Sequence, residues 1–189
     1  MSHEIYAAVE WSVRQCEKAR AKIRPLSDIL KDFGKDKPGP ILTKGVFDLL
    51  HPGHLSLFSY LEELKLSRNA SLVVAVASDG DVRRRKGADR PIQLEDSRAL
   101  QIALLAQVDW VFIYSGDELH SALQSLLPQV YVKGQDTAKA TTAYSCQKIS
   151  IKLLDNPELA GVAQADIGVV VFCDEGDVST SALIKKIRG

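Results

Sequence analysis

The chain has 189 residues, of which 46% are hydrophobic and 25% are charged, and its 24 acidic and 24 basic side chains leave no formal net charge. These values are typical of a soluble globular domain with at most a small extension, and they offer no basic excess for binding duplex nucleic acid. The cysteines are scattered and form no C-x-x-C pair, so we expect neither a disulfide framework nor a zinc site. No apolar run reaches about 20 residues and there is no signal-peptide pattern, which predicts a cytoplasmic protein without a membrane span.

The first predicted element is an amphipathic helix over residues 3–23. Ile5, Val9 and Val13 recur at helical spacing, with charged residues between them. Trp11 lies near this apolar face, so we expect it to pack on the core or on a second subunit. A homodimer is therefore the expected assembly.

A short second helix is predicted over residues 26–33. The sequence Lys-Asp-Lys-Pro-Gly-Pro at 35–40 then has the composition of a linker. We predict two parts on this basis: an N-terminal helical extension with its linker over residues 1–39, and a main domain over residues 40–189.

The main domain alternates predicted strands and helices. Apolar runs predict strands at residues 41–43, 71–77, 110–114, 130–133 and 167–173. Helical patterns lie between and after them, at residues 53–65, 94–106, 118–126 and 179–187. Continuously apolar strands are typical of parallel sheets that are buried on both faces. We predict an α/β fold with a Rossmann-like, doubly wound, five-stranded parallel sheet, whose ligands bind beyond the carboxyl ends of the strands. Residues 137–166 show no clear period.

A decapeptide at residues 45–54, Gly-Val-Phe-Asp-Leu-Leu-His-Pro-Gly-His, follows the first of these strands. Pro52 suits an early helical position, and Gly53 lets a bulky ligand approach the backbone. A helix start presents free N–H groups and a positive dipole end, which together form a phosphate site. His51 and His54 would there stabilise charge on the α-phosphate of a nucleoside triphosphate. The structural alternative is two surface histidines beside a tight turn.

This decapeptide resembles the H-x-G-H signature of the cytidylyltransferase-like nucleotidyltransferases. Further motifs resemble the adenylyltransferase domain of ADP-heptose synthases, and they follow in one order within residues 41–136 and 167–188. They lie at residues 76–79, 82–87, 90–91, 95–98, 107–111, 127–128, 132–136 and 178–181. Many motifs in one order are more specific than any single motif.

The resemblance implies roles for particular residues. It implies catalytic roles for His51, His54 and Lys86, in which the two histidines stabilise the transition state and Lys86 holds the leaving pyrophosphate. It implies nucleotide binding by Gly45, Val46, Phe47, Gly53, Ser78, Lys133, Gly134, Asp136, Ser179, Thr180 and Ser181. It implies acceptor binding by Lys44, Asp48, Asp79, Arg90 and Arg98.

Residue chemistry supports several of these roles and leaves structural alternatives open. Lys86 suits a triphosphate as a compact cation, whereas the run 83–86 that contains it also fits a solvated basic helix face. The guanidinium forks of Arg90 and Arg98 match phosphate, although Arg98 fits a helix salt bridge equally well. Asp48 would orient the site, lie near the acceptor or cap the following helix. Hydroxyls at 179–181 would cap the last helix or hold the β- and γ-phosphates.

The implied reaction transfers AMP from ATP to a sugar phosphate such as D-glycero-D-manno-heptose 1-phosphate, with Mg²⁺ and release of pyrophosphate. No protein side chain is predicted to bind the metal. The rival reaction is CTP-dependent and acts on glycerol 3-phosphate or another alditol phosphate. A nucleotide-binding scaffold without activity is the non-enzymatic alternative. Lys44, Ala77 and Gln135 depart from the resembled pattern, which has Asn, Asn and Gly there, so they bear on the acceptor.

Overall fold

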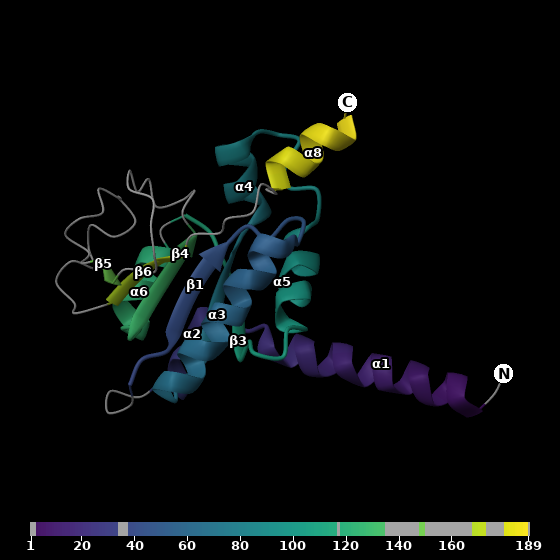
Figure 1. The fold of residues 1–189 in the computed structure, drawn as a ribbon, viewed down its shortest axis with the longest axis horizontal. Coiled ribbons are helices and arrows are strands. Elements are labelled where there is room, and N and C mark those ends of the chain that lie inside the picture. The colour runs from purple at the N-terminus through teal and green to yellow at the C-terminus, as the bar shows by residue number, and fades with distance from the viewer. Residues whose placement is uncertain are drawn as a thin grey trace.

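The computed structural model describes residues 3–33, 38–116, 118–134, 148–149, 168–172 and 180–188, and its elements are shown in Figure 1. The helices are α1 (His3–Lys22), α2 (Leu26–Ile29), the 3-10 helix η1 (Leu30–Asp32), α3 (Pro52–Arg68), α4 (Asp79–Lys86), α5 (Glu95–Ala103), α6 (Glu118–Leu126) and α8 (Thr180–Arg188). The strands are β1 (Ile41–Gly45), β2 (Leu72–Ala77), β3 (Trp110–Tyr114), β4 (Val130–Gly134), β5 (Lys148–Ile149) and β6 (Gly168–Phe172). No described helix combines the length and the apolar character that crossing a bilayer requires.

These strands form one sheet in the order β3-β2-β1-β4-β6-β5. All neighbours pair in parallel except β5, which runs antiparallel to β6. The five predicted strands are all present, but the predicted strand number is wrong, because β5 makes the sheet six-stranded. A two-residue strand is too short to show an alternation in sequence. The order reverses between β1 and β4, so the switch point lies at the carboxyl ends of these two strands.

Both faces of the sheet are covered, as the doubly wound prediction requires. In β2, Val73, Ala75 and Ala77 pack in the same core cluster as buried residues of α2, α4 and α6. Leu72, Val74 and Val76 point the other way, into a cluster with α3, α5 and the end of α1. Alternation along a strand sends successive side chains to opposite faces, so a strand covered on both sides is apolar throughout.

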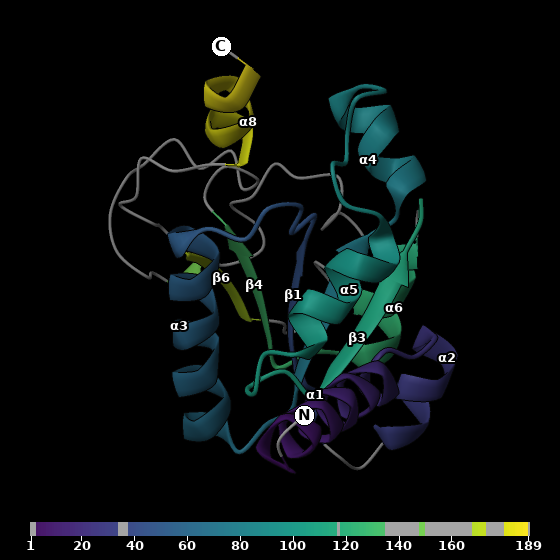
Figure 2. The ribbon, with the colours of Figure 1, turned by 90° about the vertical axis from the view of Figure 1, so that its right-hand side faces the viewer.

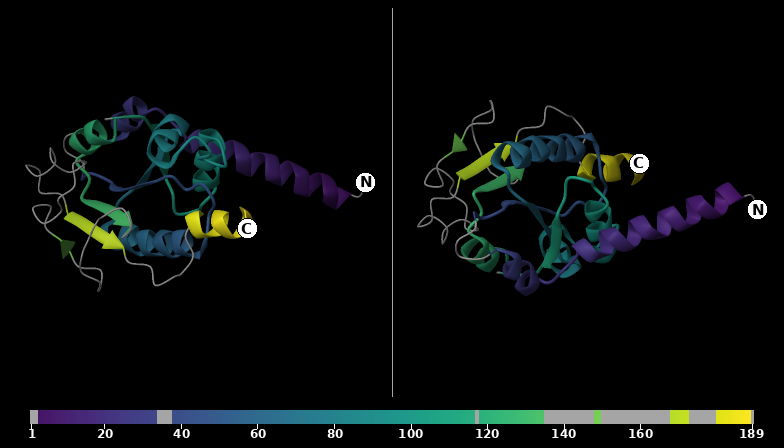
Figure 3. Two further views of the ribbon diagram at one scale, coloured as in Figure 1. Left: turned by 90° about the horizontal axis from the view of Figure 1, so that it is seen from above. Right: turned by 90° about the horizontal axis from the view of Figure 1, so that it is seen from below.

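The segment from Ala19 to Asp32 is joined to the main body. Ala19 is buried, and Ile23 forms a parallel bridge with Val111 of β3. The N–H of Arg24 donates to the carbonyl of Val111 at 2.9 Å, and its guanidinium lies 4.6 Å from the centre of the Trp110 ring. By contrast, the N-terminal half of α1 projects away from the sheet (Figures 1 and 3). The division at residues 39 and 40 into two parts stays a prediction.

Candidate active site

The two histidines lie together at the start of α3. His51 is the N-cap residue, with extended φ and ψ of −141° and 168°, and Pro52 is the first helical residue, as predicted. The N–H of His54 donates to the carbonyl of His51 at 2.9 Å, which closes the first turn. The centres of the two imidazole rings are 3.8 Å apart. Both rings therefore lie at the positive end of α3, where the helix dipole favours an anion.

Phe47 supports this pair from the core. Its backbone is left-handed, with φ of 51°, and its ring is buried. The ring meets His54 edge-on at 5.3 Å and packs against Phe58 at 5.6 Å. A Cβ atom at Gly45 would come within 2.6 Å of the Phe47 ring, so glycine is required there for this ring position. Because the Phe47 side chain points into the core, only its backbone is open to the predicted nucleotide contact.

Asp48 does not cap α3 and is buried against the loop before α5. Its carboxylate is 1% exposed and accepts hydrogen bonds from the backbone N–H groups of Ile92 and Gln93, the shortest being 2.8 Å. It also pairs with the guanidinium of Arg90, with Nε at 3.0 Å and Nη2 at 2.9 Å. The predicted helix cap is therefore wrong. Asp48 and Arg90 are buried and neutralise each other, so their position does not agree with the predicted binding of the acceptor substrate. Of the roles predicted for Asp48, orienting the site is the one that fits.

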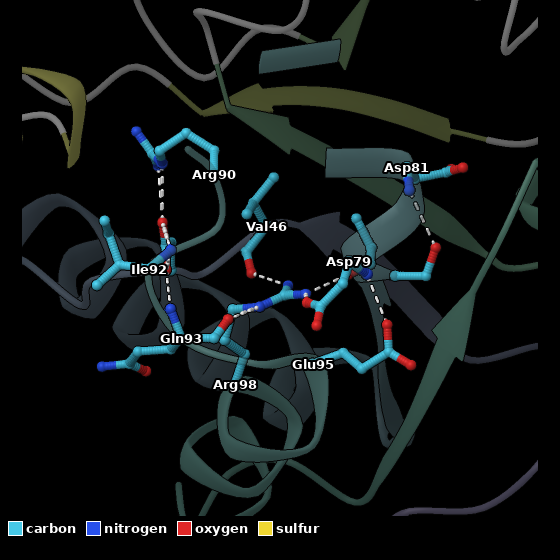
Figure 4. A network of polar contacts seen from close by, with 11 residues as sticks. Val46, Asp79, Asp81, Arg90, Ile92, Gln93, Glu95 and Arg98 are labelled. Atoms are coloured by element: carbon cyan, nitrogen blue, oxygen red, sulfur yellow. Dashed lines mark hydrogen bonds and ion pairs between the residues drawn. The ribbon is translucent and has the colours of Figure 1, made fainter. Parts of the chain in front are cut away.

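Arg98 is fully buried, at 0% exposed, and connects three segments of the chain (Figure 4). Nη1 donates to the carbonyl of Val46 at 2.6 Å, and Nε donates to that of Gln93 at 2.9 Å. Nη2 donates to the carbonyl of Ala77 at 2.8 Å and to Oδ1 of Asp79 at 2.7 Å. A buried charge costs free energy unless it is paired and hydrogen-bonded, and here every nitrogen has a protein acceptor. The salt-bridge interpretation of Arg98 is confirmed, and acceptor binding by Arg98 does not agree with its position.

The end of β2 starts a helix that the sequence pattern does not reveal. The hydroxyl of Ser78 accepts from the N–H of Asp81 at 3.3 Å and caps α4. The basic run 83–86 forms the last turn of this helix, with exposed side chains, and Arg84 pairs with Asp81. Figures 1 and 2 show α4 and α8 beyond the carboxyl ends of the strands. Lys86 is thus on the same edge of the sheet as the histidines.

The end of β4 and the start of α8 approach the same edge. Lys133 is buried near the end of β4, and Gly134 is its last residue. The hydroxyl of Thr180 donates to the carbonyl of Leu49 at 3.3 Å, which joins the start of α8 to the decapeptide. Ser181 is exposed, and Lys44 is half-buried in β1. Asp136, Ser179 and Gln135 lie outside the described residues.

Glu95 was not predicted as a site residue. Its carboxylate accepts from the N–H of Asp79 at 2.5 Å, so the Glu-Asp-Ser-Arg motif supplies both partners of Asp79. The motif itself was visible in the sequence, but the contact was not. An open surface depression lies beside this network, lined by Ser78, Asp79, Gly80, Arg83, Leu94, Glu95, Asp96 and Ser115.

Replacing Arg98 by lysine tests the role of its planar fork. Lysine keeps the charge but cannot reach the carbonyls of Val46, Ala77 and Gln93 together, so we expect the free energy of unfolding to fall by about 1–3 kcal/mol. Urea unfolding measures this change. The matched control is Arg84→Lys, whose exposed side chain pairs with Asp81, and for which we expect a change within about 0.5 kcal/mol. Equal losses in the two variants would contradict the role of Arg98.

Comparison with known proteins agrees with this arrangement. Residues 42–186 match the model of the family described as cytidylyltransferase-like. The bifunctional protein HldE of Helicobacter pylori (strain J99 / ATCC 700824) is 34% identical over 167 residues, which are 88% of this chain and 31% of that protein. The bifunctional protein HldE of Rhodospirillum rubrum is 48% identical over 96 residues, which are 50% of this chain and 18% of that protein. This chain thus spans about a third or less of these curated relatives.

One solved structure supports the fold alone. The lipopolysaccharide core biosynthesis protein from Thermoplasma volcanium GSS1 superposes with a TM-score of 0.50 at 22% sequence identity. The superposition covers 75% of this chain and 100% of that one.

Proposed function

We propose that this chain, which belongs to the cytidylyltransferase-like family of nucleotidyltransferases, transfers a nucleoside monophosphate from its triphosphate to a phosphorylated sugar and releases pyrophosphate. The observation that carries the proposal is the close pair of His51 and His54 at the start of α3, beside the switch point of the sheet. This is where an open α/β sheet binds its ligand.

In the proposed reaction, an oxygen of the acceptor phosphate attacks the α-phosphorus in line with the leaving group. The bond from that phosphorus to the bridging oxygen of the β-phosphate breaks, and pyrophosphate leaves with the electron pair. No covalent enzyme intermediate forms. Positioning and charge stabilisation therefore supply the catalysis. His51, His54 and the backbone N–H of Gly53 donate to the α-phosphate oxygens as charge develops on them.

The leaving pyrophosphate is held from two helices. Lys86, in the last turn of α4, supplies a cation, and the hydroxyl groups of Ser179 and Ser181 supply donors at the start of α8, where the Thr180 hydroxyl donates to Leu49. Both helices stand beyond the carboxyl ends of the strands (Figure 2), and the contact from Thr180 to Leu49 supports the closeness of α8 to the histidine turn. Gly134 and Asp136 are proposed to contact the nucleotide, whereas Lys133, at 1% exposed, is proposed as a positioning residue like Asp48 and Arg98.

ATP and a heptose 1-phosphate are the substrates we favour. Support comes from the motifs shared with ADP-heptose synthases and from the similarity to HldE proteins. Of the residues first assigned to the acceptor, Lys44 remains, because Asp48, Asp79, Arg90 and Arg98 pair with one another inside the protein. These four are therefore proposed as positioning residues. The CTP-dependent reaction on glycerol 3-phosphate is the second candidate.

A divalent cation fits this site only together with the substrate. Among the described residues, no group of three or more His, Cys, Asp or Glu side chains could hold a metal ion. Mg²⁺ in phosphoryl transfer is bound mainly by phosphate oxygens and water, with one or two carboxylates at most. When bound in that way, Mg²⁺ would neutralise charge on the triphosphate.

Replacing His54 by alanine should lower kcat about a hundredfold or more, with little change in nucleotide affinity. The reason is that a donor to developing charge acts mainly in the transition state. Steady-state kinetics together with nucleotide titration separate the two effects. His120→Ala, on the far helix α6, is the matched control and should leave kcat unchanged. A fully active His54→Ala enzyme would contradict the proposed reaction.

Pyrophosphate release distinguishes the candidate substrates. We expect release from ATP with D-glycero-D-manno-heptose 1-phosphate to exceed that from CTP with glycerol 3-phosphate, and the reverse order would select the second candidate. Tight nucleotide binding without release from any sugar or alditol phosphate would favour the scaffold instead. The presence of both histidines and Lys86 argues against that scaffold, because a binding module has no need of them.

A further inference from the structure

Helix α4 is joined to the body of the protein at its start. Asp79, Asp81 and Val82 are buried, whereas residues 83–86 are exposed. Val82 is the one apolar side chain of α4 in a core cluster. A surface helix normally packs through a stripe of three or four apolar residues in every two turns. Because α4 lacks such a stripe, its direction depends on the polar contacts of its first turn.

One set of these contacts comes from α5 and holds the backbone where α4 begins. The carboxylate of Glu95 accepts from the N–H of Asp79 at 2.5 Å, and Arg98 pairs with the Asp79 carboxylate at 2.7 Å (Figure 4). The cap from Ser78 to the N–H of Asp81 is local to the helix. These contacts fix the starting point of α4, but partners from a single element leave its tilt open.

The carboxylate of Asp81 supplies a support from a different element. Its side chain is 8% exposed, and both of its oxygens accept from the N–H of Gly116 at 3.2 Å. Gly116 lies in the loop after β3 and is left-handed, with φ of 54°, a conformation that favours glycine. Asp81 also pairs with Arg84, but that contact lies within α4 and cannot direct the helix as a whole. The start of α4 is therefore held between α5 and the loop after β3.

We propose that Asp81 is a positioning residue that, through Gly116, sets the tilt of α4 and so the place of Lys86 in its last turn. This inference rests on the proposed function, in which Lys86 holds the phosphates that leave as pyrophosphate. Lys86 follows Asp81 by about 7.5 Å along the helix axis, so a tilt of about 10° at Asp81 moves the far end by about 1 Å. A displacement of about that size is enough to weaken a contact that positions a substrate.

Titration calorimetry of the full chain with ATP and with AMP tests this role, and CTP and CMP are titrated in the same way. We expect Asp81→Ala to weaken triphosphate binding about tenfold and to change monophosphate binding less than about twofold, because only the triphosphate carries the groups that Lys86 holds. Loss of a negative charge would by itself strengthen the binding of an anion, so the sign of the change separates positioning from charge.

Asp96→Ala is the matched control for charge. Asp96 is an exposed carboxylate in the first turn of α5, and removing it should not weaken triphosphate binding. Asp81→Asn keeps an oxygen for the N–H of Gly116, so we expect it to recover most of the affinity that Asp81→Ala loses. In a Lys86→Ala background, Asp81→Ala should change triphosphate affinity less than about twofold, because the two residues act as one unit. Circular dichroism confirms that each variant is folded.

Hydrogen exchange gives a readout that is independent of nucleotide. Exchange in residues 79–86 should become faster in Asp81→Ala, while that in α3 stays unchanged. Unchanged exchange in α4, unchanged triphosphate binding, or a loss of binding that persists without Lys86 would overturn the inference, even if the wild-type chain releases pyrophosphate. A wild-type chain that shows the expected binding pattern but releases no pyrophosphate with any acceptor would support this role of Asp81 and contradict the proposed reaction.

Discussion

A buried positive charge must have acceptors on every side, and this requirement organises the candidate site. The guanidinium of Arg98 finds its acceptors in the loop after β1, at the end of β2 and in the loop before α5. None of these carbonyl groups can move away without leaving a donor unpaired in the core. The buried carboxylate of Asp48 needs donors in the same way, and it accepts hydrogen bonds from backbone N–H groups and from Arg90. Two buried charges thus join the histidine turn to residues 77–98.

Much of the sheet could be predicted because its strands are buried on both faces. The alternate side chains of β2 enter two different core clusters, so the whole strand is apolar and stands out in the sequence. Helix α4 could not be found in this way, since Val82 is its one buried apolar residue and the cap from Ser78 has no distinctive pattern. Strand β5 is defined by its pairing with β6, and its own two residues do not indicate that a distant segment pairs with them.

The histidine pair could also be predicted, because both residues belong to one turn and that turn follows a strand. Arg98 and Asp48 are different cases. A guanidinium suits a phosphate or a carboxylate equally well, and burial decides which one it meets. That burial depends on residues far away in sequence: Asp48 lies 45 positions from Gln93, and Arg98 lies 52 positions from Val46. Local pattern identifies such residues as important, and the tertiary fold determines their role.

The hydrogen bond from Thr180 to Leu49 joins residues 131 positions apart. Synthesis on the ribosome proceeds from the N-terminus, and domains generally fold as units. The strands β1 to β4 and the histidine turn therefore leave the ribosome well before α8 does. A nascent chain can hold the first half of its phosphate site while the second half is still untranslated. Nucleotide binding would then become complete only after α8 has left the ribosome.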